Sequence, residues 1–291
     1  ARVSAIRIYR SAFPDQLPAV ALKVSSEGEP EVTRAALSAL QGLDSLEISD
    51  ALLTGLVTAP PQLRNDFFQA IRSNPKRLEQ LLVSLEQQKI SKNIIDATQR
   101  QSLTANLDPN WIERFKKVLG DAASSDREAV IAEYRKAFAL KADPQRGKAV
   151  FAQHCAACHR IDQTGTSVGP DISDAREQSF EKMLIAILDP NRAIDGNYFR
   201  YIAATDSGTV IEGLLQESTA EHVVLRTQNG ITHTLARKEI ESFQATGVSL
   251  MPVGLEAQIA PEQMVDLLAY IKNWRYLQQG VPALATPLPS P

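Results

Sequence analysis

The stretch Cys155-Ala156-Ala157-Cys158-His159 lies just past the middle of the 291-residue chain and decides how its second half folds. A C-x-x-C-H pattern is typical of covalent attachment of a c-type haem. Two intervening residues let one helical turn bring both sulfurs to the two haem vinyl groups. The histidine that follows then lies under the ring, where its imidazole can bind the iron. We therefore predict one haem c, held by Cys155 and Cys158, with His159 as an iron ligand.

Two other uses of the cysteine pair are less consistent with the sequence. The chain has only these two cysteines, which excludes a structural zinc site with three or four thiolates. A zinc site that combined both thiolates with His154 and His159 would crowd its ligands into residues 154–159. A thioredoxin-like redox pair lies near a βαβ pattern, and no such pattern surrounds this motif.

The composition indicates a globular protein without a nucleic-acid-binding face. Hydrophobic residues make up 44% of the chain and charged residues 22%, and the length allows two domains with separate cores. The formal net charge is −3 with both signs interspersed, whereas a nucleic-acid partner requires a basic surface. No apolar run approaches the roughly 18–20 residues of a membrane helix, so we predict no transmembrane segment.

The first residues do not have the pattern of a signal peptide. Ala1-Arg2-Val3-Ser4-Ala5-Ile6 resembles the middle of a helix, and we expect a mature or excised fragment of a longer precursor. Haem is attached to C-x-x-C-H motifs outside the cytoplasm. The motif therefore predicts a periplasmic or otherwise extracytoplasmic location.

The first half of the chain contains a weak internal repeat of helical patterns. One set of apolar positions recurs after 31 residues and another after 29, each with the spacing of one buried helix face. The sets are Val32, Ala36, Leu37 and Leu40 with Leu63, Phe67, Phe68 and Ile71, and Leu52, Leu53 and Leu56 with Leu81, Leu82 and Leu85. A period of about 30 residues built from two short helices is typical of an α-solenoid. We predict a helical-repeat domain, resembling HEAT repeats, over residues 1–120.

This first half offers no catalytic grouping. All four histidines and both cysteines lie beyond residue 150, and the charged residues scatter as expected for solvated helix faces. We therefore predict a scaffold or docking surface. Residues 121–142 are expected to form a linker and a connecting helix.

The haem motif is expected to follow a helix at the start of a domain over residues 143–279. Asp143-Pro144 is a typical helix start, as is Asp108-Pro109 in the first half, because aspartate caps a helix and proline fits its first turn. A terminal helix from 261 to about 277 is expected to cross the first one, with Gly147 and Phe151 against Leu268-Ala269-Tyr270. Residues 280–291, rich in proline, are expected to form a loosely attached tail.

Between these helices the hydrophobic period changes from helical to alternating. The alternation predicts short strands at residues 198–205, 209–216, 221–227, 231–236 and 239–243. Asp206-Ser207-Gly208 and Asn229-Gly230 have the residues of hairpin turns, the second those of a type I′ turn. We predict a small antiparallel β-sheet at about 198–244, inserted into the haem domain, where it could cover one haem edge or offer a docking surface.

Several residues around the motif resemble class I cytochromes c. They are Phe151, the C-x-x-C-H residues and the loop Val168-Gly169-Pro170-Asp171. In that family the proline carbonyl accepts a hydrogen bond from the second ring nitrogen of the proximal histidine and so orients the ring. The resemblance implies this role for Pro170, and the alternative is an ordinary turn proline.

Met251 is the candidate for the second axial ligand of the iron. The loop Ser249-Leu250-Met251-Pro252 precedes the terminal helix and resembles the distal-ligand loop of class I cytochromes c. A methionine thioether opposite a histidine raises the reduction potential of a c-type haem. Met183 and Met264 lie at apolar helix positions and are expected in the core. The alternatives that stay open are an open iron site and the two strand histidines, His222 and His233.

The order of these pieces resembles the haem-binding domain at the C-terminal end of planctomycete-type membrane-associated dehydrogenase-like proteins. The resemblance covers residues 143–277 and rests on the motifs above together with segments 188–194 and 249–255. HEAT-like helices often precede that domain. In such proteins a β-propeller similar to sugar dehydrogenases can lie further upstream, and because none is present in this sequence its activity is not carried over.

The combined expectation is a mainly α protein, with an N-terminal HEAT-like α-solenoid followed by a cytochrome c domain that carries a small antiparallel sheet. Such a domain is expected to pass single electrons from a dehydrogenase, either a partner or an upstream domain, to another extracytoplasmic cytochrome or other carrier. We expect no catalysis by the domain itself. One alternative is a haem peroxidase or a gas or redox sensor with an open or labile distal site. Another is a helical-repeat interaction protein whose haem is structural.

Overall fold

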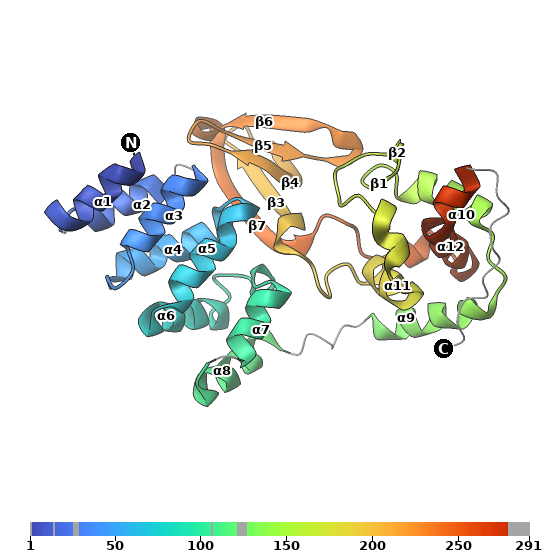
Figure 1. Ribbon diagram of the computed structural model, residues 1–291, viewed down its shortest axis with the longest axis horizontal. Helices are drawn as coiled ribbons and strands as arrows, with labels where there is room; N and C mark the ends of the chain where they lie inside the picture. The colour runs from blue at the N-terminus through green and yellow to red at the C-terminus, as the bar shows by residue number, and fades with distance from the viewer. Residues whose placement is uncertain (1, 14, 26–28, 106, 121–126, 279–291) are drawn as a thin grey trace. The chain divides into compact units, whose positions relative to one another are not determined.

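The computed structural model describes residues 2–13, 15–25, 29–105, 107–120 and 127–278 (Figure 1). The chain forms two compact units. The helix–sheet unit consists of residues 1–120, 195–226 and 232–248, and the C-x-x-C-H unit consists of residues 121–194, 227–231 and 249–291. Within the described ranges, no helix combines the length and the apolar character needed to cross a membrane.

The described part of the helix–sheet unit begins with eight α-helices (Figure 1). Three of them start on a side-chain cap, because Ser45, Asn74 and Asp108 each accept a hydrogen bond from a backbone N–H of the first turn. The predicted helix start at Asp108-Pro109 is thereby confirmed. The helices are α1 (Arg2–Ala12), α2 (Leu17–Ser25), α3 (Pro30–Ala39), α4 (Leu46–Thr58), α5 (Pro61–Arg72), α6 (Pro75–Glu86), α7 (Ala97–Ala105) and α8 (Pro109–Leu119).

The apolar positions of the predicted repeat lie on the buried faces of α3 to α6. Every one of them is buried, and Leu40, Leu52, Phe68 and Ile71 are fully inaccessible. The contact between α4 and α5 is close, because a Cβ on Gly55 would lie 2.1 Å from the Phe67 ring. The buried faces that the repeat predicts are therefore present, and they hold neighbouring helices together.

Two arginines depart from the expectation that the charged residues of this half are solvated. Arg64 and Arg77 are 2% and 1% exposed. The guanidinium of Arg77 donates to the Leu40 and Ala70 carbonyls at 2.7 and 2.9 Å and to Leu43 at 2.5 Å. It thereby satisfies carbonyls at helix ends that burial would otherwise leave unpaired. The expectation was wrong at these positions, since the charge serves buried backbone groups.

A five-stranded sheet completes the helix–sheet unit. Its strands are β3 (Phe199–Thr205), β4 (Val210–Ser218), β5 (His222–Arg226), β6 (Thr232–Ala236) and β7 (Ile240–Ser249), in the order β6-β5-β4-β3-β7. The pairs from β3 to β6 are antiparallel, with Tyr201 opposite Gly213 and Val223 opposite Leu235. Asn229 and Gly230 have positive φ angles of 60° and 73°, as a type I′ turn requires.

The sheet groups with the N-terminal helices, whereas the sequence places it inside the haem domain. Arg64 of α5 donates to the Gly196 carbonyl at 2.6 Å and to the Tyr201 hydroxyl, and this hydroxyl donates to the Ala59 carbonyl at 2.5 Å. The Arg64 guanidinium also lies 4.6 Å from the centre of the Phe199 ring. Arg64 of α5 thus packs on the buried face of β3. The strands are an insertion in sequence and a partner of the helices in space.

The C-x-x-C-H unit is built on a crossing of two helices. Its helices are α9 (Glu128–Lys136), α10 (Pro144–His154), α11 (Phe180–Leu188) and α12 (Pro261–Gln278), with a short ribbon of β1 (Arg160–Ile161) and β2 (Thr164–Gly165). A Cβ on Gly147 would lie 1.9 Å from the Asp266 carbonyl oxygen, and the Phe151 and Tyr270 rings are 5.6 Å apart. The predicted crossing of the first and last helices of this domain is confirmed at these residues.

The connecting helix belongs to the core of this unit. Ile131, Tyr134 and Phe138 are buried in the same cluster as Phe151 and residues of α12. The Tyr134 hydroxyl donates to the Ile259 carbonyl at 2.6 Å. Residues 121–126, the first part of the predicted linker and connecting helix at 121–142, and the predicted tail at 280–291 lie outside the described residues.

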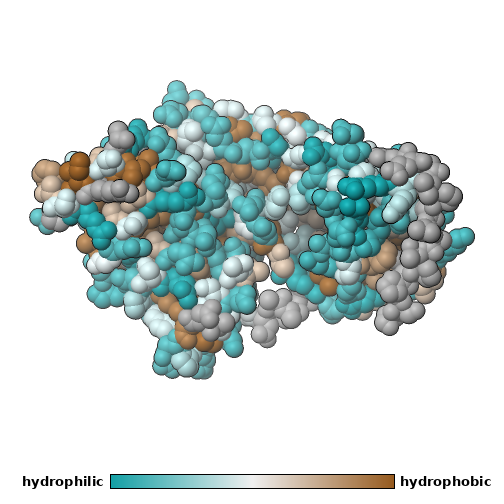
Figure 2. Space-filling view, in the orientation of Figure 1, coloured by the Kyte–Doolittle hydropathy of each residue, from teal (hydrophilic) through white to brown (hydrophobic). Residues whose placement is uncertain are grey.

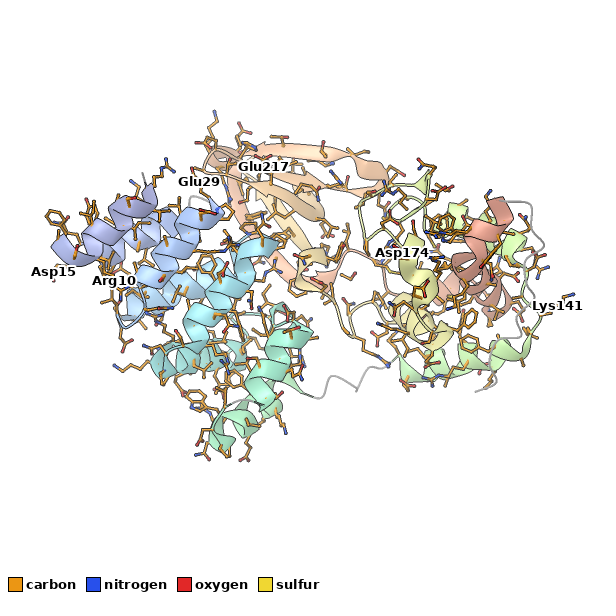
Figure 3. The ribbon with its side chains drawn as sticks, viewed as in Figure 1. Arg10, Asp15, Glu29, Lys141, Asp174 and Glu217 are labelled. Atoms are coloured by element: carbon orange, nitrogen blue, oxygen red, sulfur yellow. The ribbon has the colours of Figure 1, made fainter. Side chains whose placement is uncertain are left out.

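The surface carries charges of both signs and several exposed hydrophobic side chains. Figure 2 shows hydrophobic residues gathered over the end of the helix–sheet unit where α1 lies, and Ile8 and Phe13 of this region are 58% and 50% exposed. Lys141, Asp174 and Glu217 are exposed and project outward (Figure 3).

Candidate haem-binding site

The C-x-x-C-H residues form a tight turn directly after α10. Cys155 ends the helix, with its N–H donating to the Phe151 carbonyl at 2.9 Å. The N–H groups of Cys158 and His159 both donate to the Cys155 carbonyl, at 3.0 and 2.9 Å. A single turn therefore carries both sulfurs and the imidazole, as the spacing predicts.

The two thiols are free and half-buried. Burial raises the pKa of Cys155 to about 12 and also raises that of Cys158. A thiol–disulfide oxidoreductase requires a thiolate whose pKa is lowered, so this environment does not suit a thioredoxin-like pair. Across the described ranges, no three His, Cys, Asp or Glu side chains are grouped so that they could hold a metal ion.

His159 is held by one ring nitrogen and keeps the other available. Its Nδ1 lies 2.9 Å from the Pro170 carbonyl oxygen, and since a carbonyl only accepts, Nδ1 carries the proton. Burial lowers the pKa of His159, and the bond to Pro170 only partly offsets this effect. The ring is therefore neutral at physiological pH, with the Nε2 lone pair free to bind a metal.

Gly169 leaves room for the imidazole. A Cβ at this position would lie 2.8 Å from Cε1 and 3.1 Å from Nδ1 of His159. A larger residue would push the ring out of its place. The loop Val168-Gly169-Pro170-Asp171 thus both holds and accommodates His159.

The backbone of the motif is fixed by contacts from two other segments. The Ala157 carbonyl accepts hydrogen bonds from the Thr166 hydroxyl at 2.7 Å and from the Asn229 N–H at 2.8 Å. The Cys158 carbonyl accepts from the N–H groups of Val168 and Gly169 at 3.0 and 2.8 Å. Sequence reasoning missed the contact from Asn229, since nothing in a turn pattern indicates what the turn touches.

Met251 lies on the same hydrophobic core as the motif. Its half-buried side chain packs against the cluster that also takes up Cys155. The Met251 N–H donates to the Ser249 hydroxyl at 3.1 Å, and the Ser249 N–H donates to Asn191 Oδ1 at 2.8 Å. The structure therefore brings the predicted methionine loop and the C-x-x-C-H turn onto one core.

The other candidate ligands are two methionines of the core and two histidines of the strands. Met183 and Met264 are buried in the core at 6% and 0% exposure, as predicted. His222 and His233 lie on β5 and β6 of the helix–sheet unit. His222 contacts Thr219 and Glu217, at 3.2 and 3.4 Å. His154 is the last residue of α10.

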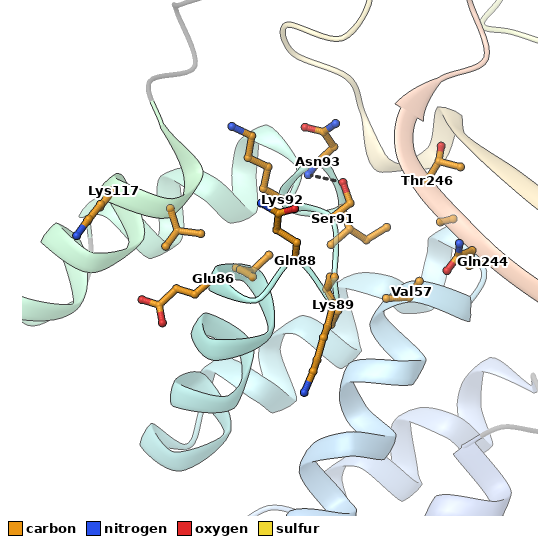
Figure 4. A pocket seen from close by; sticks show the side chains of 15 residues that line it. Val57, Glu86, Gln88, Lys89, Ser91, Lys92, Asn93, Lys117, Gln244 and Thr246 are labelled. Carbon is orange, nitrogen blue, oxygen red and sulfur yellow. Dashed lines mark hydrogen bonds between the residues drawn. The ribbon is translucent and has the colours of Figure 1, made fainter.

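A cavity of about 910 Å³ lies in the helix–sheet unit and is separate from these residues (Figure 4). Lys89, Lys92 and Lys117 line it, together with Gln244 of β7. Figure 4 shows the three lysine side chains pointing in different directions, so their ammonium groups do not converge on one point. None of the predicted site residues lines this cavity.

The residues of the C-x-x-C-H unit fit a covalently held haem. Two free thiols lie one turn apart, and a half-buried neutral imidazole presents Nε2, to which no described residue donates a hydrogen bond. A thioether packs on the same core. A haem c with His/Met ligation uses two thiols for attachment of the porphyrin, and an imidazole and a thioether as ligands of the iron.

Comparison with known proteins agrees with this fit. The family model described as Cytochrome c matches residues 144–275. No protein with a curated description matches the chain. The family match supports a cytochrome c-like haem-binding domain over these residues and a role in haem-based electron transfer.

Proposed function

We propose that the chain is a mono-haem c-type cytochrome module that passes single electrons between an extracytoplasmic dehydrogenase and a downstream carrier. The observation that carries this proposal is the His159 ring, whose Nδ1 is bound to the Pro170 carbonyl while Nε2 faces no donor among the described residues. Such an imidazole beside two free thiols is prepared for iron.

Each residue of the site has a defined task in this proposal. Cys155 and Cys158 would tether the porphyrin through thioether bonds, and His159 would bind iron in the orientation that Pro170 sets. Met251 would supply a second ligand, whose soft sulfur would favour the ferrous state and a higher potential. The bound haem would supply one-electron chemistry. A haem held by both residues would leave substrates no direct access to the iron.

The rest of the chain has a supporting task. The buried helix faces that repeat from α3 to α6 support a HEAT-like solenoid, which would serve as a mount or docking surface for redox partners. The electron donor would be a dehydrogenase, as a separate protein or an upstream domain, and the acceptor another cytochrome or carrier. Covalent haem attachment supports a periplasmic or otherwise extracytoplasmic location.

Mass and absorption spectra of the purified, matured protein test the proposal. We expect a mass increased by one haem, a low-spin six-coordinate spectrum, and in the ferric form the weak far-red band of methionine ligation. A mass without added porphyrin would overturn the proposal. A high-spin ferric spectrum that shifts with peroxide, or a ferrous spectrum that shifts with carbon monoxide, would instead indicate a peroxidase or sensor.

A further inference from the structure

We infer that Asn191 is a positioning residue for Met251, which holds the distal loop closed where the chain re-enters the C-x-x-C-H unit. The inference rests on the proposed function, because it assumes that Met251 is an iron ligand. Asn191 belongs to segment 188–194, to whose residues the sequence analysis assigns no role toward the iron.

A chain of two hydrogen bonds joins Asn191 to the backbone of Met251. Asn191 Oδ1 accepts from the Ser249 N–H at 2.8 Å, across a separation of 58 residues. The Ser249 hydroxyl in turn accepts from the Met251 N–H at 3.1 Å. The amide of Asn191 is therefore linked through one residue to the backbone of the proposed ligand.

This link lies where the chain re-enters the C-x-x-C-H unit. The chain leaves the C-x-x-C-H unit after Ile194, forms most of the sheet, and returns for good at Ser249. Ser249 is also the last residue of β7. The bond from Asn191 thus joins the exit and the return of a long excursion, two residues before Met251.

Asn191 itself lies on a turn that hydrogen bonds hold in place. The Asp189 N–H donates to the Ile185 carbonyl at 2.8 Å and ends α11, and the Arg192 N–H donates to the Asp189 carbonyl at 3.1 Å. Arg192 also forms an ion pair of 2.9 Å with the buried Asp189 carboxylate. The acceptor that Asn191 presents is therefore held in place.

The segment that follows Met251 in the chain has its own contacts with the core. Leu255 is 6% exposed and lies in the core, and the Tyr134 hydroxyl donates to the Glu256 and Ile259 carbonyls at 3.1 and 2.6 Å. Residues after Met251 are thus anchored by buried groups. Before Met251, the exposed hydrogen bond to Asn191 ties Ser249, at the end of β7, to this unit, and its loss would let this half of the loop open.

An external ligand of the iron reports on this opening, because it must first displace Met251. Its apparent affinity scales with the fraction of molecules whose loop is open. An intramolecular hydrogen bond that breaks on opening changes this fraction by about three- to tenfold. Removal of the Asn191 amide should therefore tighten external-ligand binding by this factor.

The experiment is an imidazole titration of the ferric, full-length, haem-loaded protein, followed by absorption. Asn191→Ala is expected to bind imidazole about three- to tenfold more tightly than wild type and to have a lower reduction potential. Asn191→Asp keeps an oxygen acceptor and should restore most of the difference. Asn273→Ala is the matched control, since it removes an asparagine bond to the Ala269 carbonyl, 2.8 Å long, elsewhere in the same unit.

The outcomes separate the inference from the proposal on which it rests. If wild type has the methionine band and Asn191→Ala binds imidazole no more tightly than Asn273→Ala, the positioning role is wrong. If wild type lacks the band and Met251→Ala leaves the spectrum unchanged, the ligand assignment is wrong and the inference falls with it.

Discussion

His159 shows how far single residues could be predicted. The resemblance to class I cytochromes c implies a bond from its ring to the Pro170 carbonyl, and the structure has that bond at 2.9 Å. The contacts from Asn191 and Asn229 were not predictable, because each reaches a partner that is distant in sequence. Buried Arg64 was missed for another reason, since a charge in a helical pattern normally indicates a solvated face.

Replacement of Met251 by alanine tests the second ligand. We expect the far-red band to disappear, the reduction potential to fall and the ferric iron to become accessible to external ligands, because the thioether is lost. Met183→Leu is the control, as a conservative change in the core that should cost less than about 1.5 kcal/mol and leave the spectrum unchanged. An unaltered spectrum in the Met251 variant would mean that another group binds the iron.

Glu256 should make the C-x-x-C-H unit sensitive to acid. A hydrogen bond from Arg127 lowers the pKa of Glu256 in the folded state. A lowered pKa stabilises the fold above the unfolded value of roughly 4.3, and this stability is lost as pH falls through the lower folded pKa. Glu256→Gln should therefore cost about 1 kcal/mol or less at pH 7 and nothing at the acid end.

The measurement for Glu256 is denaturant unfolding from pH 7 down to pH 2, in a double-mutant cycle with Arg127→Gln. The pH-dependent difference between wild type and Glu256→Gln should vanish when Arg127 is already replaced. An equal difference in both backgrounds would mean that the ion pair does not set the pKa.

At the scale of elements, whether a segment forms a helix or a strand was easier to predict than the element against which it packs. Alternation predicted the strands, and the helix start at Asp108-Pro109 was confirmed. Alternation also says that one face of a strand is buried, but it does not say against what. The sheet could therefore be located in the sequence, while its packing on α5 could not be foreseen.

The crossing of α10 and α12 depends on the absence of a side chain at Gly147. A Cβ there would lie 1.9 Å from the Asp266 carbonyl oxygen and 2.9 Å from Tyr270 Cβ, both of which belong to a buried helix. Gly147→Ala should destabilise the unit by about 1–3 kcal/mol or more, because the two backbones must move apart. Thermal unfolding monitored at the haem band measures this loss.

Lys148→Ala provides the comparison for that variant, since Lys148 is the exposed neighbour on the same helix. It should change stability by no more than about 0.5 kcal/mol. Equal melting temperatures for the two variants would show that the helices tolerate a side chain at the crossing.

At the scale of the whole molecule, the chain passes repeatedly between two units with separate cores. The sequence predicts two bodies of this kind, because the helical pattern of the first half and the C-x-x-C-H motif of the second are distinct. It predicts them as consecutive segments. The structure differs in that the sheet groups with the N-terminal helices, where the buried Arg64 guanidinium donates to the Tyr201 hydroxyl.

Tyr201→Phe tests whether the two units respond separately. The change removes the acceptor of an Arg64 donor and the donor to the Ala59 carbonyl, which should destabilise the helix–sheet unit by about 1–3 kcal/mol. Circular dichroism of the helices should then report a lower melting temperature while the haem absorption keeps its own. A parallel shift of both signals would indicate a single cooperative transition.

The contact between α5 and β3 also bears on which fragments of this protein are expected to be soluble. A fragment limited to residues 144–275, the span that the family comparison suggests, retains the strands and discards the helices on which they pack. Phe199, Tyr201 and Ala203, all inaccessible in the whole chain, would then meet water along one strand. Such a face promotes aggregation, so the fragment should be recovered from cells in soluble form only when residues 1–120 are co-expressed with it.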